Sequence, residues 1–509
     1  MASGFRTASR HTRSRFRYPS SRAARAPLRN SFTNSEVTST TTTYTGNRYA
    51  LERRRASVSF RTHAVELMFA LGFVCQVALL SGSIGQARVP MRMAVFGASL
   101  ALLFGLRGKG LPSPAVKPAK FIVAIVALAF FNPGTNTLAA AAAQIAMYLA
   151  ILGPLFWVPR LTVDLSNLRR VLLVIWIFQS LSALIGILQV YYPGRFDPSI
   201  STVILDEGRS YVKGLQYQNA YGQSVFRAMG LSDVPGGAGT AGVSAVMFGA
   251  AFLLIWRRWS LRMLATGTMV AGLAAIFLFH VRASLVMLAA CALTLIAVLA
   301  IRRARVRATQ AAWRRREAGT LTRLLAVLGV VAFFGFTWAI AVGGNSVADR
   351  FATLTAADPG TVYHQNRGHF IEYSIQELLP KYPLGAGLGR WGMMNHYFGD
   401  NSDPNTSMIW SEEQFTAWLV DGGVPLILAY LLAVAVATMF AFRLALRPVD
   451  PELAIFAAVI CAYDVGAVVL CLDYPFFGGQ MGMEFWMLNA VLFAVASSRE
   501  ATPDQTPGR

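Results

Sequence analysis

Twelve long apolar runs separated by short polar breaks limit what this chain can fold into. From Ala64 onward they lie at 64–85, 90–106, 119–132, 136–157, 168–190, 238–256, 262–279, 283–301, 321–343, 421–443, 452–471 and 481–498. A helix crosses the hydrocarbon core of a bilayer with about 20 apolar residues. The chain is 55% hydrophobic and 14% charged, whereas a soluble domain carries about 25% charged residues. We therefore expect an all-α polytopic membrane protein with about twelve transmembrane helices, give or take one or two.

The stretch from Arg262 to Ile301 is too long for one crossing. Its polar break is His280-Val281-Arg282, so the sequence predicts two helices joined there by a minimal turn. An arginine in such a turn lies at or near membrane depth, where an ionisable residue is costly. Arg282 is therefore a candidate functional residue, and snorkelling of its side chain to the lipid headgroups is the alternative.

Lysine and arginine set the expected orientation, because cytoplasmic loops retain them. With the N-terminus inside, 35 of the 46 lysines and arginines lie on the cytoplasmic side. The net charge of +21 then faces anionic lipid, and we expect membrane lipids and no nucleic acid as partners. Both termini are expected to be cytoplasmic.

The expected organisation has five parts. They are a disordered basic tail (1–60), helices one to nine (61–343) with an outer loop at 191–237, a large extracytoplasmic loop (344–420), helices ten to twelve (421–498) and a second tail (499–509). The arginine- and serine-rich start also resembles an organelle transit peptide. The four cysteines fall in or at the ends of apolar runs without CxxC spacing, which predicts buried thiols.

The large loop between spans nine and ten concentrates ionisable side chains. It holds Arg350, His364, Arg367, His369, Glu372, Glu377, Lys381, Arg390, His396, Glu412 and Glu413. Long charged loops of this kind are usually functional. His369 and Glu372 share one face of an expected helix at 366–379, but neither an HExxH pattern nor a clear third ligand accompanies them, so we expect no metal.

Two smaller features of this region have structural interpretations. Gly385, Gly387 and Gly389 predict a tight turn beside Arg390, because a phosphate cradle would need a flanking strand and helix. Asp421 begins the tenth expected span, where a carboxylate complements a helix N-terminus. We expect it to cap that helix.

Basic residues on the outer side indicate an anionic ligand there. Eleven of the 46 lysines and arginines are expected on the outer side. Nine of them bear on a possible ligand: Arg195, Arg209, Lys213, Arg227, Arg282, Arg350, Arg367, Lys381 and Arg390. Guanidinium is a planar fork of donors that matches phosphate and keeps its proton. Long outer loops are largely exempt from the charge rule, so Arg195, Lys213 and Lys381 also fit a purely solvated role.

Four segments, in order, resemble the O-antigen ligase and polysaccharide polymerase superfamily. They are FRAMGLSDVPGGAGTAGVSAVMF from Phe226, HVRASLVMLA with Arg282, SVADRFATL followed by Arg367 and KYPLGAGLGRW, and EEQFTAWLVDGGVPLIL. The resemblance covers about Ala220 to Ala445. It implies a metal-independent membrane glycosyltransferase of GT-C-like fold in the bacterial cytoplasmic (inner) membrane, with no cofactor. The donor would be a glycan on undecaprenyl pyrophosphate and the acceptor a sugar hydroxyl, alongside polysaccharide export and assembly proteins.

The same resemblance suggests roles for particular residues. Ligases carry His-Asn where this chain has Glu412-Glu413, which favours a polymerase or an exopolysaccharide enzyme over a ligase. We expect Glu412 to act as general base, with Arg282 stabilising the departing pyrophosphate. Substrate binding is expected of Arg209, Arg227, Arg367, Arg390, Glu413 and His369. An anion transporter and a sensor or assembly subunit remain as alternatives, although Asp464 is the one convincing charge within a span.

Overall fold

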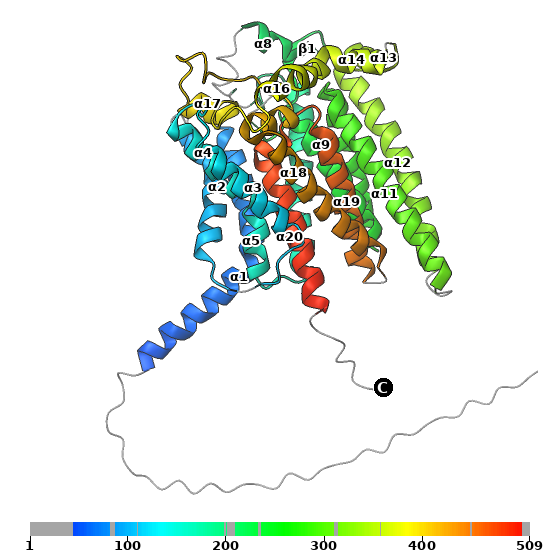
Figure 1. Ribbon diagram of the computed structural model, residues 1–509. Helices are drawn as coiled ribbons and strands as arrows, with labels where there is room; N and C mark the ends of the chain where they lie inside the picture. Colours follow the sequence, from blue (N-terminus) through cyan, green and yellow to red (C-terminus); the bar gives the residue numbers. More distant parts are fainter. Residues whose placement is uncertain are drawn as a thin grey trace, which may run out of the picture. The chain divides into compact units, whose positions relative to one another are not determined.

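The computed structural model describes residues 44–81, 87–108, 110–197, 200, 209–232, 236–309, 314–356, 358–447 and 450–500. The helices before the large loop are α1 (Tyr44–Leu79), α2 (Arg88–Gly105), α3 (Val116–Ala129), α4 (Leu138–Leu152), α5 (Pro154–Trp157), α6 (Leu165–Tyr191), α8 (Arg209–Gly214), α9 (Gly237–Ile255), α10 (Trp259–Leu278), α11 (Arg282–Thr309) and α12 (Arg314–Gly343). The later ones are α13 (Asn345–Ala356), α14 (Pro359–Tyr363), α15 (His369–Tyr373), α16 (Leu379–Lys381), α17 (Gly392–Phe398), α18 (Gln414–Leu446), α19 (Pro451–Leu470) and α20 (Gln480–Glu500). Long helices packed side by side dominate the structure (Figure 1).

The protein is a predominantly helical, multi-pass membrane protein. Within the described ranges, ten helices are long and apolar enough to cross a membrane, or eleven if the bent pair Leu138–Leu152 and Pro154–Arg160 counts as one span. Each of the twelve predicted runs coincides with a helix or with this pair. The third, α3, has 14 residues, fewer than the roughly 17 that a span requires, and is not among the ten.

Although short, α3 joins the two ends of the helix bundle. Past its C-terminus, Asn132 donates to the Gly385 carbonyl oxygen of the large loop at 2.8 Å. Before its N-terminus, the backbone at Gly110 lies against Pro159, at the other end of the bent pair. The third predicted run is therefore a helix with contacts near both ends of the bundle, but it is too short to count among the candidate spans.

The chain forms two compact units, Met1–Ala56 and Ser57–Arg509, and all ten long apolar helices belong to the second. In the first unit, α1 begins at Tyr44, inside the segment expected to lack structure. Residues 1–43 of that expected tail, and 501–509 of the C-terminal one, lie outside the described part.

The predicted turn within 262–301 is confirmed. Helix α10 ends at Leu278 and α11 begins at Arg282. His280 between them has φ of 59°, a conformation uncommon for a residue with a side chain. Its ring lies against that of Tyr217, with ring centroids 4.0 Å apart. Tyr217 belongs to a hairpin of β1 (Gln216–Gln218) and β2 (Ser224–Phe226), antiparallel with Gln216 opposite Phe226, which the sequence did not lead us to expect.

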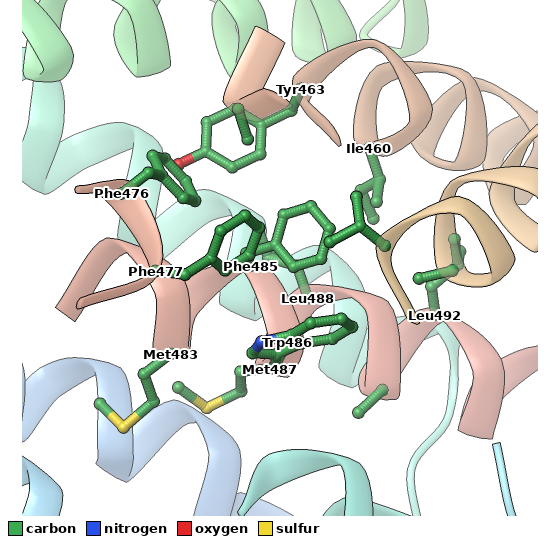
Figure 2. Packing of buried hydrophobic residues seen from close by; sticks show 14 of the residues in the cluster. Ile460, Tyr463, Phe476, Phe477, Met483, Phe485, Trp486, Met487, Leu488 and Leu492 are labelled. Carbon is green, nitrogen blue, oxygen red and sulfur yellow. The ribbon is translucent and has the colours of Figure 1, made fainter. Parts of the chain in front are cut away.

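Aromatic packing fixes the C-terminal helices to one another. The Trp418 ring of α18 stacks on Tyr430 with centroids 4.7 Å apart, and on Phe477, in the turn before α20, at 5.7 Å. Phe477 also meets Phe485 edge-to-face at 5.1 Å, and Figure 2 shows Phe477 and Phe485 beside Trp486. Such pairs contribute about 0.5–1.5 kcal/mol each beyond area burial. They hold the turn between α19 and α20 at a fixed place beside α18.

The end of the bundle opposite the large loop is rich in arginine contacts. Arg302 is buried and donates to the Ala445 carbonyl at 2.6 Å, Arg169 pairs with Glu452 at 2.5 Å, and Arg170 pairs with Glu66 at 3.0 Å. These cations come from two of the expected cytoplasmic segments, the one with Arg169 and Arg170 and the one that begins at Arg302. The structure thus collects them at one end, as the predicted topology requires.

Candidate functional site

The large loop is mostly helical and wraps the other end of the bundle, which we call the loop face. Two π-helical turns, His364–Gly368 and Ser374–Leu378, flank α15. With α14 and α16 they form one helical stretch over 359–381, confirming the helix expected at 366–379. A π-helical turn widens the helix locally, and such turns are frequent at functional sites. The first carries Arg367, and the second carries Ser374.

Arg367 is the centre of an acid–arginine cluster, which comprises Arg367, Glu412, Glu413, Asp473 and Tyr363. The guanidinium forms an ion pair with Glu412, and its Nε donates to Asp473 at 3.1 Å. Tyr363 donates from its hydroxyl to the Leu472 carbonyl at 3.0 Å. Arg367 and Glu412 are about one-third and one-fifth exposed. The cluster therefore lies at the surface of the loop face, and its acids outnumber its single arginine.

Glu413 lies beneath this surface. Its side chain is fully buried, and one carboxylate oxygen accepts from the Thr416 hydroxyl at 3.1 Å. Thr416 in turn contacts Ser374 of the second π-helical turn at 2.7 Å. The other oxygen, Oε1, has no hydrogen-bond partner among the described residues. Because burial disfavours the charged form, the pKa of Glu413 is raised, and this outweighs the opposing effects of Thr416 and of the Arg367 charge.

The loop between α19 and α20 completes the cluster and is tied directly to the start of α18. The Gln414 amide donates to the Cys471 carbonyl at 3.1 Å, and its side-chain oxygen accepts from the Phe477 amide at 2.6 Å. Asp473 was not among the expected site residues. The signal that could have found it is a lone acid between two apolar runs, in CLDYPFF.

Two other expected binding residues have local roles. Arg390 is buried and donates to the carbonyls of Ser407 (3.0 Å) and Ala386 (3.1 Å), so it holds the loop together. His369 is exposed, and its Nδ1 lies 3.1 Å from the His364 carbonyl oxygen. Glu372 pairs with His364 at 2.6 Å rather than with His369, and within the described residues no three His, Cys, Asp or Glu could share a metal ion.

The remaining expected arginines lie around the β1–β2 hairpin. Arg282 begins α11, and Arg227 follows β2 and donates to the Gly214 carbonyl at 3.0 Å. Arg209 begins α8, and its side chain lies outside the described residues. The hairpin rests on α6 and α12 through bonds from Asn219 to Val190 and from Ala220 to Val342. This group is therefore separate in its supporting helices from the cluster on α18.

The glycine turn is structural, as predicted. Gly385, Gly387 and Gly389 all have positive φ, from 72° to 112°. A Cβ at Gly387 would overlap the backbone of Gly134, so the turn is pressed against the segment between α3 and α4. The four cysteines are free and buried, also as predicted.

The expectation for Asp421 is wrong. Helix α18 starts at Gln414, seven residues before the expected span, so Asp421 lies two turns inside it. Its carboxylate is buried and accepts from Tyr148 (2.6 Å) and Gln144 (3.0 Å) of α4. Asp464 and Glu484 are also buried, in α19 and α20. Three acids therefore lie within the helices, where the sequence indicated one convincing example.

A cavity of about 390 Å³ lies beside the cluster. Its walls come from the ends of α1 and α2, from α4, from the start of α17 and from residues 474–480. Polar lining is contributed by Gln76, Arg92, Gln144, Trp391 and Gln480. None of these was expected to be a site residue, because they are spread over more than 400 positions of the chain.

No protein-family model matches the chain, and no curated protein matches it.

Proposed function

We propose that the protein is a polysaccharide polymerase or ligase of GT-C-like architecture, a member of the O-antigen ligase and polymerase superfamily. It would transfer a glycan from an undecaprenyl-pyrophosphate-type carrier to a sugar hydroxyl at the outer face of the bacterial cytoplasmic membrane. The single observation that carries the proposal is the burial of Glu413 beside Arg367 on the loop face of a multi-pass bundle. A basic carboxylate next to a cation supplies what glycosyl transfer to a hydroxyl needs.

The proposed reaction uses the cluster in two ways. The donor pyrophosphate competes with Glu412 and Asp473 for Arg367, and this competition uncovers the buried Glu413. Glu413 then accepts the proton of the acceptor hydroxyl, whose oxygen bonds to the donor's anomeric carbon. The bond from that carbon to the pyrophosphate oxygen breaks, and the carrier pyrophosphate leaves with the electron pair. Arg282 stabilises its charge, together with Arg209 and Arg227, the other arginines around the β1–β2 hairpin.

This proposal exchanges the roles first expected of the two glutamates. Glu412 is engaged by Arg367 and by the Trp410 indole N–H at 2.8 Å, whereas Glu413 has the raised pKa and an oxygen without a partner in the described part of the chain. A base with a pKa nearer neutrality takes a proton more effectively. We therefore assign proton acceptance to Glu413 and acceptor hydrogen bonding to Glu412. His369 and Arg390 then support the loop rather than the substrate.

The test is the glycan profile of native membranes after deletion of the chain. Accumulation of short lipid-linked repeats supports a polymerase, and full-length polymer retained on its carrier supports a ligase. Complementation with the intact chain should restore the profile. An unchanged profile in a strain that makes a lipid-linked glycan would contradict both.

A transporter of anions or small solutes is the second candidate. Asp421, Asp464 and Glu484, buried within helices, favour it, because intramembrane acids often mark ion or proton paths. Each of these acids accepts a hydrogen bond within the helix bundle. Asp421 accepts from Tyr148 of α4, Asp464 from Asn489 of α20 at 2.9 Å, and Glu484 from Gln480 of its own helix at 3.1 Å. Solute uptake into reconstituted vesicles, lost on Asp464→Asn with the glycan profile unchanged, would favour transport over transfer.

A further inference from the structure

The cavity beside the cluster combines an apolar wall with a few converging amide groups. Met91, Val95, Phe96 and Met147 supply apolar surface, while Gln76, Gln144 and Gln480 supply carboxamides. The Gln144 side chain is 5% exposed, so it is placed there by packing rather than by contact with bulk solvent. A concave, mostly apolar site with few placed polar groups is the usual form of a small-molecule site, and about 390 Å³ lies in the range of such sites.

Two of the glutamines are oriented by a chain of hydrogen bonds. Gln480 donates from Nε2 to Glu484 at 3.1 Å, which directs its carbonyl oxygen toward Gln76. Gln76 donates from Nε2 to that oxygen at 3.0 Å. Gln76 is therefore the last member of this hydrogen-bond chain, and because Gln76 lines the cavity, its carbonyl oxygen can accept from a bound ligand. Fixed side chains of this kind lose little rotamer entropy when they bind a ligand.

The third glutamine is held from the opposite side. Gln144 donates to Asp421 at 3.0 Å, and Tyr148 donates to the same carboxylate oxygen at 2.6 Å. Trp391, 7% exposed, lines the cavity together with Tyr474. Amide donors and acceptors thus converge from α1, α4 and α20 on a space that also has two aromatic walls.

We infer that this cavity binds a hydroxyl-rich sugar unit, which is the acceptor end of the glycan. Each sugar hydroxyl both donates and accepts, as a carboxamide does, and the ring's C–H faces suit aromatic and apolar walls. The inference rests on the proposed function, which it deepens by naming the acceptor subsite. The cavity wall formed by 474–480 directly follows Asp473 of the acid–arginine cluster, so a sugar seated here would reach toward Glu413.

The binding test uses the full-length protein in lipid nanodiscs and saturation-transfer NMR with maltose and N-acetylglucosamine as probes. Wild type should transfer saturation to the sugar protons. Gln76→Leu, which removes the outer amide, should weaken binding at least tenfold. Met91→Trp fills the cavity from its half-buried edge and should abolish binding. Gln376→Leu is the matched control, because Gln376 is exposed on the loop and bonds Glu372; it should bind as wild type does.

The outcomes separate this inference from the proposed function. Sugar binding that Met91→Trp and Gln76→Leu leave unchanged overturns the cavity as the subsite. Saturation of the alkyl probe 1-hexanol without any sugar signal also overturns it, in favour of a lipid-chain pocket. In membranes with the native lipid-linked donor, the variants should raise the acceptor KM at least tenfold while donor binding is retained. Sugar binding at the cavity in a protein that consumes no donor would contradict the transferase but keep the sugar site.

Discussion

At the scale of single residues, the two adjacent glutamates have very different surroundings. Glu412 is partly exposed and paired with Arg367, and Glu413 is buried close enough to feel the charge of the same guanidinium. A backbone in extended conformation at Glu413, just before α18, turns consecutive side chains in different directions. Adjacent identical residues can therefore have separate roles, and substitution can distinguish them.

Glu413→Gln should lower polymer output about 10²–10⁴-fold, the usual effect of losing a general base. Because burial raises the pKa of Glu413, the wild-type rate should fall on the acid side at a pH above the ordinary glutamate pKa of about 4.3. The measurement is donor consumption in membrane vesicles across pH. Glu377→Gln, an exposed glutamate of the same loop, is the control. Full activity of Glu413→Gln with loss in Glu412→Gln would return the base to Glu412.

The same substitution should have the opposite effect on stability. A carboxyl whose pKa is raised in the folded protein stabilises it below the unfolded pKa, and this contribution is lost as pH rises through the folded pKa. Glutamine stays neutral, so Glu413→Gln should keep or raise the Tm at pH 8 relative to wild type. A lower Tm would show that the charged form is the one the fold supports.

At the scale of elements, the kink in α18 connects the site to the bundle. Gly423 has φ of 65° and ψ of −157° inside this helix, and Pro425 follows. The break lets the Val424 amide donate to the Pro383 carbonyl at 2.9 Å. The first two turns of α18, with Asp421, thereby lie against the large loop, and Thr416 bonds both Glu413 and Ser374 of that loop.

Gly423→Ala should destabilise the protein by about 1–3 kcal/mol, because a side chain is strained at this φ. Its Cβ would also overlap the Pro383 carbonyl oxygen and lie 2.6 Å from the Gly385 nitrogen. The measurement is Tm of the purified protein by intrinsic fluorescence. Gly97→Ala in α2 is the control, since a Cβ there meets nothing within 4 Å. Equal Tm shifts in both variants would argue against strain at the kink.

Arg282 is the first residue of α11. Three residues separate it from α10, and the middle one, His280, has a positive φ. Arg282→Lys keeps the charge but loses the planar fork, so polymer output should fall at least tenfold while the protein still inserts. Output is read on gels of membrane glycan, with insertion checked by blotting. Arg195→Lys in the other outer loop should behave as wild type. Normal output from Arg282→Ala would leave snorkelling as its role.

The long helices could be predicted from the hydropathy of the sequence, whereas the candidate site could be predicted only in part. The break at His280 was predictable because 40 apolar residues cannot cross once. The pairing of Arg367 with Asp473 was not, because it joins positions 106 residues apart across the fold. The start of α18 was missed because Asp421-Gly422-Gly423 reads as the start of a span, whereas the helix begins at Gln414 and continues across a kink at Gly423. The burial that distinguishes Glu413 from Glu412 likewise arises from tertiary packing.

At the scale of the whole molecule, the proposed chemistry depends on which side of the membrane the loop face occupies. The structure gathers Arg169, Arg170 and Arg302 at the opposite end of the bundle. Because lysine and arginine are enriched in cytoplasmic loops, this end of the bundle would face the cytoplasm. The acid–arginine cluster and the cavity would then face outward, where a lipid carrier presents its completed glycan.

Cysteine labelling in intact cells tests this orientation. Ser402→Cys lies on the loop face at an exposed position and should react with an impermeant maleimide. Ala308→Cys, at the end of α11, should react only after the cells are permeabilised, because 35 of the 46 lysines and arginines then lie inside. The four native cysteines are buried, so the unsubstituted chain gives the background. Labelling of position 308 in intact cells would reverse the topology, and with it the access of an outer-leaflet glycan donor to Arg367 and Glu413.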